Sequence, residues 1–210
     1  MSELATNKIS PVTGTTVTLG DSGDTFNIPS GANITNSGTA TGFGGGKVFQ
    51  VIQTHDTTTR SQSLSATTVT SISGLNATIT PVSATSNIFI QVRWNGESSN
   101  TADYWDMLFG VKRDTTEIGS APSAGNRRGG LAIVGGGGYA VGGEVGSTPD
   151  NVHYEFLDTT RSSGTSSITY HATALPNGAC TFYTNRTGND SDHGYTERMT
   201  STITLWEIGA

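Results

Sequence analysis

The sequence predicts an all-β protein, in which a short, β-rich N-terminal stalk precedes an antiparallel, jelly-roll-like β-sandwich. Apolar and polar residues alternate along many short segments, which is the period of a half-buried strand. Glycine accounts for 28 of the 210 residues and separates these segments, while helical spacing of apolar residues nowhere continues beyond one or two turns. Charged residues make up only 13 %, so serine, threonine and asparagine must cover much of the surface.

The most regular alternation lies between residues 166 and 208. Residues 168–172 alternate as a half-buried strand, and Pro176-Asn177-Gly178 follows as a turn signal. A tight reversal there is expected to bring residues 180–184 back antiparallel to the first strand. The last segment alternates almost to the end of the sequence, which predicts that it closes the sheet.

Other alternating segments raise the expected total to about eight to ten strands over residues 47–210, the number and spacing of a two-sheet sandwich. Residues 48–53 carry apolar side chains on both faces, which favours a strand near the middle of a sheet. Residues 66–79 are expected to form two short strands around Ser73-Gly74.

Residues 87–94 show the alternation clearly, with Phe89, Gln91 and Arg93 facing away from the expected core. The long stretch 119–147 is rich in glycine and is expected to be an excursion with one or two short strands. The side chains predicted to point inward are Ile88, Ile90, Val92, Trp94, Trp105, Met107, Phe109, Val111, Val152, Tyr154 and Phe156.

Residues 1–46 form a separate predicted region, and residues 47–210 form the head. Short alternating pieces separated by glycine contain few large side chains, so this region cannot bury enough surface to offset its ordering entropy alone. We expect several copies to wind together around an axis, whereas a disordered linker is the alternative. The predicted trimerisation and attachment residues are Val17, Leu19, Phe26, Ile28 and Ile34.

The charge and apolar patterns argue against several functions. A net charge of −6 argues against nucleic-acid binding, which requires clustered lysine and arginine. No apolar run is long enough to cross a bilayer, and the N-terminus lacks the pattern of a secretion signal. The single cysteine, Cys180, excludes an intrachain disulfide and is expected to be a small buried apolar residue.

Catalytic and metal-binding patterns are weak, and no cofactor is predicted. The four histidines lie in four separate segments, and His153 and His171 are expected to face solvent. Residues 189–194 loosely resemble a calcium loop but lack its closing acidic residue, unless Glu197 takes that role. The candidate carboxylate pairs for a polysaccharide-degrading enzyme are Asp103 with Asp106 and Glu144 with Asp150.

Aromatic rings beside polar side chains can stack on sugar faces and so bind carbohydrate. Trp94 and Trp105 belong to the inward-facing sets, which favours core packing for both. Tyr139 lies in a glycine-rich segment and is the less constrained candidate. The predicted ligand-binding residues are Asp103, Tyr104, Arg127, Arg128 and Tyr139.

The segment ATNKISPVTGTTVTLGDSGDTFNIPSGANITNSGTATGFGGGKVFQV resembles the opening of tail-fibre and other fibrous virion proteins of tailed bacteriophages, especially marine ones. The later pieces ATITPVSATSNIFIQV, YEFLDTTRSSGTSSITYHA, FYTNR and STITLWEI are similar to the β-sandwich that commonly follows that opening. The resemblance implies a non-enzymatic virion structural protein on the particle surface, a homotrimer with a stalk and a head. It carries over no catalytic residues.

Several alternatives remain open at this point. The fibre is expected to attach to the tail or the capsid through its N-terminal segment, and its head to present residues 95–103, 119–147 and 185–196 to a host-surface glycan or protein. A capsid-stabilising decoration protein without a receptor role is the main alternative. A polysaccharide-degrading enzyme is the remaining one. Neither nucleic acid nor membrane insertion is among the expected partners.

Overall fold

The computed structural model describes residues 8–38, 47–99, 106–134 and 146–209. The chain divides into two units, residues 1–43 and residues 44–210. The described residues contain strands and turns but no helix, as the sequence predicts, and therefore no helix that could cross a membrane.

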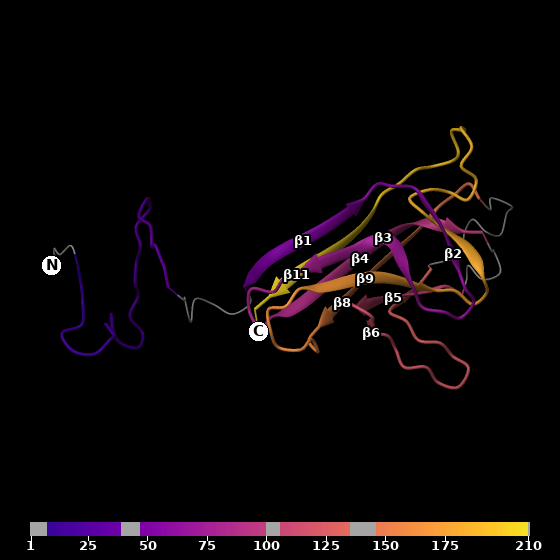
Figure 1. The fold of residues 1–210 in the computed structure, drawn as a ribbon. Coiled ribbons are helices and arrows are strands. Elements are labelled where there is room, and N and C mark those ends of the chain that lie inside the picture. Colours follow the sequence, from indigo (N-terminus) through magenta and orange to yellow (C-terminus); the bar gives the residue numbers. More distant parts are fainter. Residues whose placement is uncertain (1–7, 39–46, 100–105, 135–145, 210) are drawn as a thin grey trace. The chain divides into compact units, whose positions relative to one another are not determined.

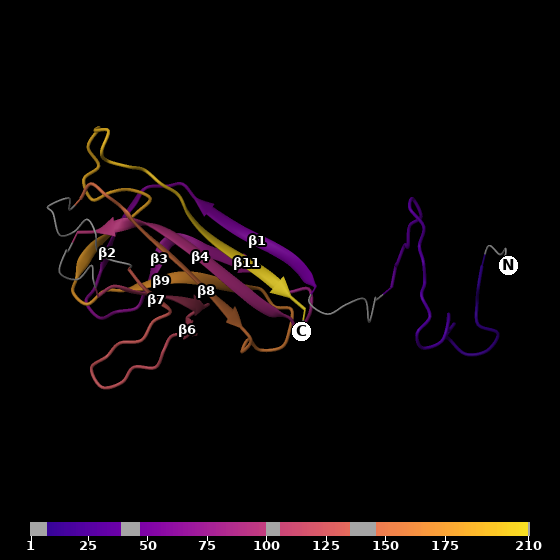
Figure 2. The same ribbon diagram turned by 180° about the vertical axis from the view of Figure 1, so that it is seen from behind.

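The larger unit consists of two antiparallel sheets, one of six strands and one of five (Figures 1 and 2). The six-stranded sheet contains β1 (Val48–Asp56), β2 (Arg60–Leu64), β4 (Asn87–Ser98), β8 (Asp150–Asp158), β10 (Cys180–Thr184) and β11 (Ser201–Ile208). The five-stranded sheet contains β3 (Thr70–Ile79), β5 (Leu108–Arg113), β6 (Thr116–Ile118), β7 (Ala132–Ile133) and β9 (Ile168–Leu175). The predicted β-sandwich is therefore confirmed at this level.

Strand β4 is the centre of the six-stranded sheet. It pairs with β8 along one edge, while its other edge pairs first with β11 and then, near Ser98, with β10. Strand β11 lies between β1 and β4, and β2 pairs with β10 (Figure 1). The five-stranded sheet has the order β3-β9-β5-β6, with β7 on β5.

The core lies between the inward faces of the two sheets, where aromatic rings meet. Trp94 stacks on Phe182 with ring centroids 4.6 Å apart, and Phe109 lies against both rings. The Trp94 indole donates a hydrogen bond to the Thr184 hydroxyl at 3.1 Å, so its polar group is satisfied although the side chain is fully buried. The described members of the predicted inward set are buried, except Phe156, which is partly buried against the core; Trp105 lies outside the described residues.

The predicted hairpin at Pro176-Asn177-Gly178 is wrong. Strand β9 pairs with β3 and β5 in one sheet, whereas β10 pairs with β2 and β4 in the other. The turn therefore carries the chain from one sheet to the other. Both strands bury one face, and crossing between sheets sets these faces opposite each other across the core, which pairing side by side cannot do.

Two further strand predictions are corrected. Strand β1 lies at the edge of its sheet, because it pairs only with β11, and the apolar side chains on its second face are exposed. Residues 70–79 form one strand rather than two, with a register shift between Ser71 and Asn76 in its pairing with β9. Gly74 lies within the shift at a φ of 80°, a conformation that glycine adopts without strain.

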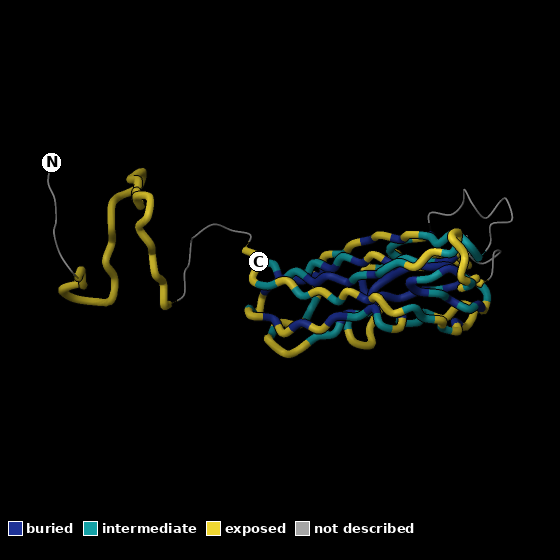
Figure 3. The backbone as a smooth tube through the Cα atoms, turned by 90° about the horizontal axis from the view of Figure 1, so that it is seen from above, coloured by how far each residue is buried: buried dark blue, intermediate teal, exposed yellow. Residues whose placement is uncertain are grey.

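The described part of the smaller unit, residues 8–38, is exposed throughout (Figure 3). Its hydrogen bonds are local turns, such as those from the Asp24 amide to the Asp21 carbonyl and from the Ala32 amide to the Pro29 carbonyl. Residues 8–38 contain none of the short strands predicted for this region. A strand requires a neighbour to pair its backbone groups, and no other segment of residues 8–38 supplies one.

Candidate functional site

The predicted assembly residues lie in an extended segment with large exposed apolar side chains. Their exposed fractions range from 39 % for Val17 to 64 % for Phe26, and Ile9 and Val12 in the same segment are also exposed. A run of apolar side chains left in water is typical of a segment that a partner covers. This segment is one of the candidate functional surfaces.

A second candidate surface lies where two connections of the head meet at Glu97. This residue is near the end of β4, and its carboxylate accepts hydrogen bonds from the Gly146 amide at 2.5 Å and the Gly188 amide at 2.6 Å. The Asn189 amide also donates to the Gly146 carbonyl at 2.7 Å. Glu97 therefore joins the approach to β8 to the connection between β10 and β11, and parts of the predicted loops 95–103, 119–147 and 185–196 do come together.

The carboxyl group of Asp150 lies beside Glu97 in this cluster. Burial, together with the charge of Glu97, raises the pKa of Asp150 to about 6. Burial also raises the pKa of Glu97, although the amides of Gly188 and Gly146 and the charge of Arg186 act in the opposite direction. Two neighbouring carboxyl groups in a partly buried position are costly to ionise together. The cluster is therefore sensitive to pH.

The connection between β10 and β11 is fixed by side chains on both sides. Asn185 is fully buried at a positive φ of 62°, and its amide donates to the carbonyls of Asp56 and Thr58. Arg186 lies over the Tyr183 ring, with its guanidinium carbon 4.8 Å from the ring centroid. These contacts hold the start of the 185–200 connection in a defined conformation.

Of the predicted ligand-binding residues, Arg127 and Arg128 lie in the described part of the structure. Asp103, Tyr104 and Tyr139 lie outside the described residues. Arg127 is exposed and donates to the Ala124 carbonyl, while Arg128 donates to the carbonyls of Asp106 and Leu175.

Arg128 lines an open hollow of about 400 Å³ formed mainly by residues 117–129. Figures 1 and 2 show the connection between β6 and β7 on the opposite side of the sandwich from the 185–200 connection. Residues 119–131 therefore lie apart from the 185–200 connection, whereas Gly146, at the other end of the same predicted loop, is hydrogen-bonded to Asn189.

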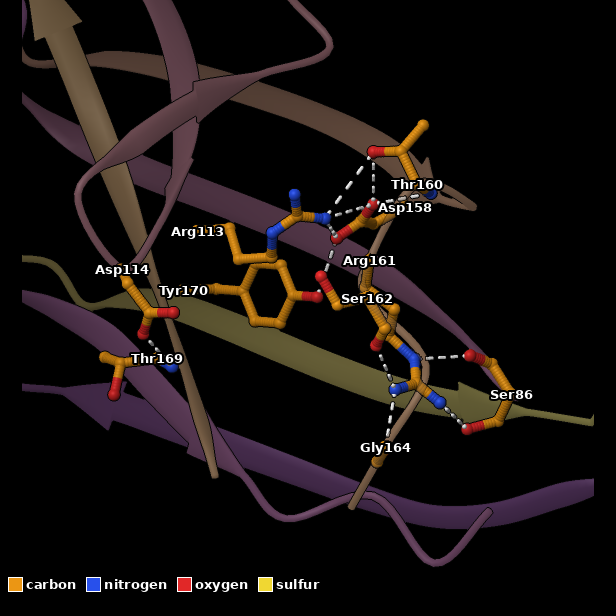
Figure 4. A network of polar contacts seen from close by, with 10 residues as sticks. All are labelled: Ser86, Arg113, Asp114, Asp158, Thr160, Arg161, Ser162, Gly164, Thr169 and Tyr170. Atoms are coloured by element: carbon orange, nitrogen blue, oxygen red, sulfur yellow. Dashed lines mark hydrogen bonds and ion pairs between the residues drawn. The ribbon is translucent and has the colours of Figure 1, made fainter. Parts of the chain in front are cut away.

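Asp158 anchors a polar network at the other end of the head (Figure 4). Its fully buried carboxylate accepts two hydrogen bonds from Arg113, at 2.8 and 3.0 Å, and one from the Tyr170 hydroxyl at 2.8 Å. The Thr160 amide and hydroxyl complete the set at 3.0 Å each. Burial acts to raise the pKa of Asp158, but these hydrogen bonds and the Arg113 charge outweigh it and hold the pKa below its usual value.

Arg161 extends this network to the C-terminal strand. Its guanidinium donates to the carbonyls of Ser83 and Ser86 and to the Ser86 hydroxyl, and Ser86 in turn donates to the buried Glu207 carboxylate at 2.6 Å. Glu207 also accepts from the amides of Val82 and Ser83. These polar groups form hydrogen bonds with one another. We therefore assign the network a structural role, in which it holds the connections around β4 and β8 in place.

Each predicted pair of catalytic carboxylates has one member outside the described residues. No group of three or more histidine, cysteine, aspartate or glutamate side chains there is placed to hold a metal ion. The carboxyl group beside Asp150 is Glu97, while Asp103 and Glu144, the partners considered in the sequence, lie outside the described residues. His153 is exposed as predicted, His171 is partly buried, and Cys180 is buried as predicted.

A third candidate surface, missed in the sequence analysis, is the outward face of the six-stranded sheet. Antiparallel pairing aligns its side chains in rows that cross β1, β11, β4 and β8 in turn. The basic row contains His55, Thr202, Arg93 and His153. The amide row contains Gln53, Thr204, Gln91 and Glu155. The apolar row contains Val51, Trp206, Phe89 and Leu157.

An open hollow of about 380 Å³ lies over the basic and amide rows. Within it, the Gln53 side chain donates to the Thr204 hydroxyl at 2.8 Å, and the Trp206 indole donates to the Gln91 side-chain oxygen at 2.9 Å. The sequence does contain a signal for this surface, because Phe89, Gln91 and Arg93 form the outward set of β4. Which residues of other strands join them depends on strand order, which the alternation leaves open.

No protein-family model matches this chain, and no curated protein matches it. The resemblance to fibrous virion proteins therefore stays a prediction.

Proposed function

We propose that this protein is a non-enzymatic structural subunit of a bacteriophage virion, a short fibre on the tail or capsid. Three chains join through their N-terminal segments, which also dock on the particle, and the β-sandwich heads face outward to contact the host surface. The trimeric stalk and the jelly-roll-like character of the head are parts of this proposal.

The observation that carries the proposal is the exposure of the apolar side chains in residues 8–38. Phe26 and Ile34 are 64 % and 63 % exposed, and the hydrogen bonds of this segment are short-range turns. Full burial of one such side chain contributes about 1.5–3 kcal/mol, so several of them per chain supply a substantial drive for association. Copies of the same segment provide both the apolar surface and the missing strand partners.

The head also supports the proposal, because, unlike residues 8–38, it has a hydrophobic core of its own. Its largest apolar side chains, such as Trp94, Phe109 and Phe182, are buried within a single chain. Assembly therefore need not contribute to the folding of the head. Such a head is suited to being carried by a thin attachment segment and exposed to solvent.

The choice of a virion fibre, rather than another assembly, rests on the resemblance of residues 5–51 and the later sandwich pieces to fibrous phage proteins. The proposed non-enzymatic role is consistent with Glu97, whose carboxylate accepts hydrogen bonds from two backbone amides. These hydrogen bonds give Glu97 a structural role, because they hold two connections of the head together.

The mass of the purified chain in solution tests the assembly. Sedimentation equilibrium is expected to give three times the 21.8 kDa of one chain, and removal of residues 1–43 is expected to give a folded monomer. A full-length monomer at micromolar concentration would contradict the proposal. Electron microscopy of particles labelled with an antibody to the head then locates the protein, and an unlabelled particle would exclude the virion role.

A further inference from the structure

The basic row differs from the rest of the protein in its charge. It places one guanidinium and two imidazole groups in register, whereas the whole chain has a net charge of −6. None of the residues that line the hollow over the basic and amide rows is acidic, and Glu155, the one carboxylate in those rows, lies at their β8 edge, 3.5 Å from the side-chain amide of Gln91. The hollow is therefore matched to an anionic ligand rather than to a neutral or basic one.

Arg93 has fewer polar contacts than the four arginines that form ion pairs in the head. Arg60, Arg113, Arg186 and Arg198 each form an ion pair with an aspartate. Arg93 is exposed, and in the described residues its side chain makes one long hydrogen bond, 3.4 Å, to the Thr200 hydroxyl. A guanidinium in this state presents a fork of donors that fits a carboxylate, sulfate or phosphate group.

The neighbouring rows supply the other contacts that a sugar requires. Amide, hydroxyl and imidazole groups both donate and accept hydrogen bonds, as sugar hydroxyls do. The apolar row lies alongside the amide row and includes Val51 and Leu157, which are 45 % and 41 % exposed, and the indole of Trp206. An apolar strip of this kind can pack against the C–H face of a pyranose ring.

We propose that the outward face of the six-stranded sheet binds an acidic oligosaccharide, with Arg93 pairing its anionic group. The chain of sugars lies across β1, β11, β4 and β8. Neighbouring strands are about 4.8 Å apart, comparable to the repeat of one sugar unit in a linear glycan, so successive sugars meet successive strands. This inference rests on the proposed role of the head in contacting the host surface, but not on assembly through residues 8–38.

Two other occupants of this face are conceivable. An acidic peptide also matches the charge, but it offers few hydroxyl groups to the amide row. A second copy of this chain could cover the apolar row. It would, however, also place its own acidic surface against the polar side chains of the other two rows, which stay hydrated on an open sheet face. An acidic glycan can make favourable contacts with all three rows at once. Binding of either other occupant in its place would contradict the proposal.

Isothermal titration calorimetry of the full chain tests the proposal. The probes are a galacturonic acid hexasaccharide, its fully methyl-esterified form, which has the same rings without charge, and a sulfated hexasaccharide. At least one acidic probe is expected to bind, with the ester at least about tenfold weaker than the acid where the acid binds. No binding of either acidic probe, or equal binding of the galacturonate and its ester, overturns the proposal.

Variants then assign the site. Arg93→Gln is expected to lower affinity for the bound acidic probe about tenfold, and Gln91→Ala about fivefold, because each removes direct hydrogen bonds. Lys47→Gln removes the same charge from an exposed residue outside the hollow and is expected to leave affinity unchanged. Unchanged binding by Arg93→Gln overturns the assignment.

Sedimentation of the same samples separates this inference from the proposed assembly. All three variants are expected to keep the mass of the unsubstituted chain. A fall in mass with Arg93→Gln, without a change in glycan affinity, would identify the face as an interface between copies and overturn the glycan proposal. Glycan binding by a chain that proves monomeric would instead support the site and contradict the trimer.

Discussion

The N-terminal segment and the head use apolar side chains in opposite ways. In the head, Trp94, Phe109 and Phe182 are buried against one another within one chain. In residues 8–38, Phe26 and Leu19 remain more than half exposed (Figure 3). The two regions have similar alternation, so alternation alone does not determine whether a segment forms a sheet.

The difference follows from how many strands each region can bring together. The head has eleven described strands, and its two sheets cover each other's inward faces. The described N-terminal residues 8–38 have a few short alternating pieces and contain no second layer. Burial requires two surfaces, and a segment that has only one must obtain the other from a partner. Substitutions in the two regions test this contrast.

Trp94→Ala should destabilise the head by about 3–5 kcal/mol, because it removes a fully buried aromatic ring and leaves a cavity beside Phe182. Urea unfolding followed by circular dichroism measures the change. Trp94→Phe is the matched control and should cost less, since it keeps most of the ring contact. A loss below about 1 kcal/mol for the alanine variant would show that the core does not depend on this stack.

Arg113→Met should destabilise the head by about 2–3 kcal/mol at pH 7, because it leaves the buried Asp158 carboxylate without its ion pair. The native pKa of Asp158 is lowered, so its ionised form stabilises the fold above about pH 4, and this contribution disappears as the pH falls through the native pKa. The difference between the two proteins should therefore narrow in acid.

Unfolding measured at pH 7 and pH 3 checks this prediction. Arg127→Met, the same change in an exposed connection, should alter stability by no more than about 0.5 kcal/mol. An Arg113 variant that behaves like the Arg127 variant would remove the assigned role of the network in Figure 4.

Phe26→Ser should weaken assembly by about 2 kcal/mol per chain and leave the unfolding of the head unchanged, since the side chain is exposed within its own chain. Sedimentation velocity over a dilution series should show dissociation at higher concentration than for the unsubstituted protein. Phe26→Leu keeps an apolar side chain and should assemble nearly normally. Equal assembly of the serine and leucine variants would argue that this segment is not the site of association.

Asp150→Asn should stabilise the head on the order of 1 kcal/mol at pH 7. Because the native pKa is raised to about 6, the folded state keeps a proton that the unfolded state releases above about pH 4, so stability falls as pH rises through this window. The asparagine variant avoids that loss, and its advantage should vanish below about pH 4.

Thermal unfolding at pH 4 and pH 7 measures the gain. Asp192→Asn changes an exposed carboxylate and serves as the control. A gain in stability that is independent of pH would show that burial and the neighbouring Glu97 do not raise the pKa of Asp150.

The alternation of apolar and polar residues determined much of the fold. It identified the inward faces of β4, β5 and β8, because a strand with one buried face must place apolar residues at every second position. It also predicted a β-sandwich with no helix, and the exposed position of His153 followed from the same rule. The apolar residues of the N-terminal segment could be named from the sequence, whereas their assembly into an oligomer stays a prediction.

Which strands pair, and which side chains meet, was decided in three dimensions rather than by the local pattern. The turn signal at Pro176-Asn177-Gly178 predicts a reversal of direction, but it does not distinguish a hairpin from a crossing between sheets. The joining of Gly146 and Gly188 by Glu97, and the alignment of His55, Arg93 and His153, likewise involve residues far apart in the sequence. Local periodicity fixes which way a side chain points, while its neighbours depend on strand order, which is set by packing of the whole chain.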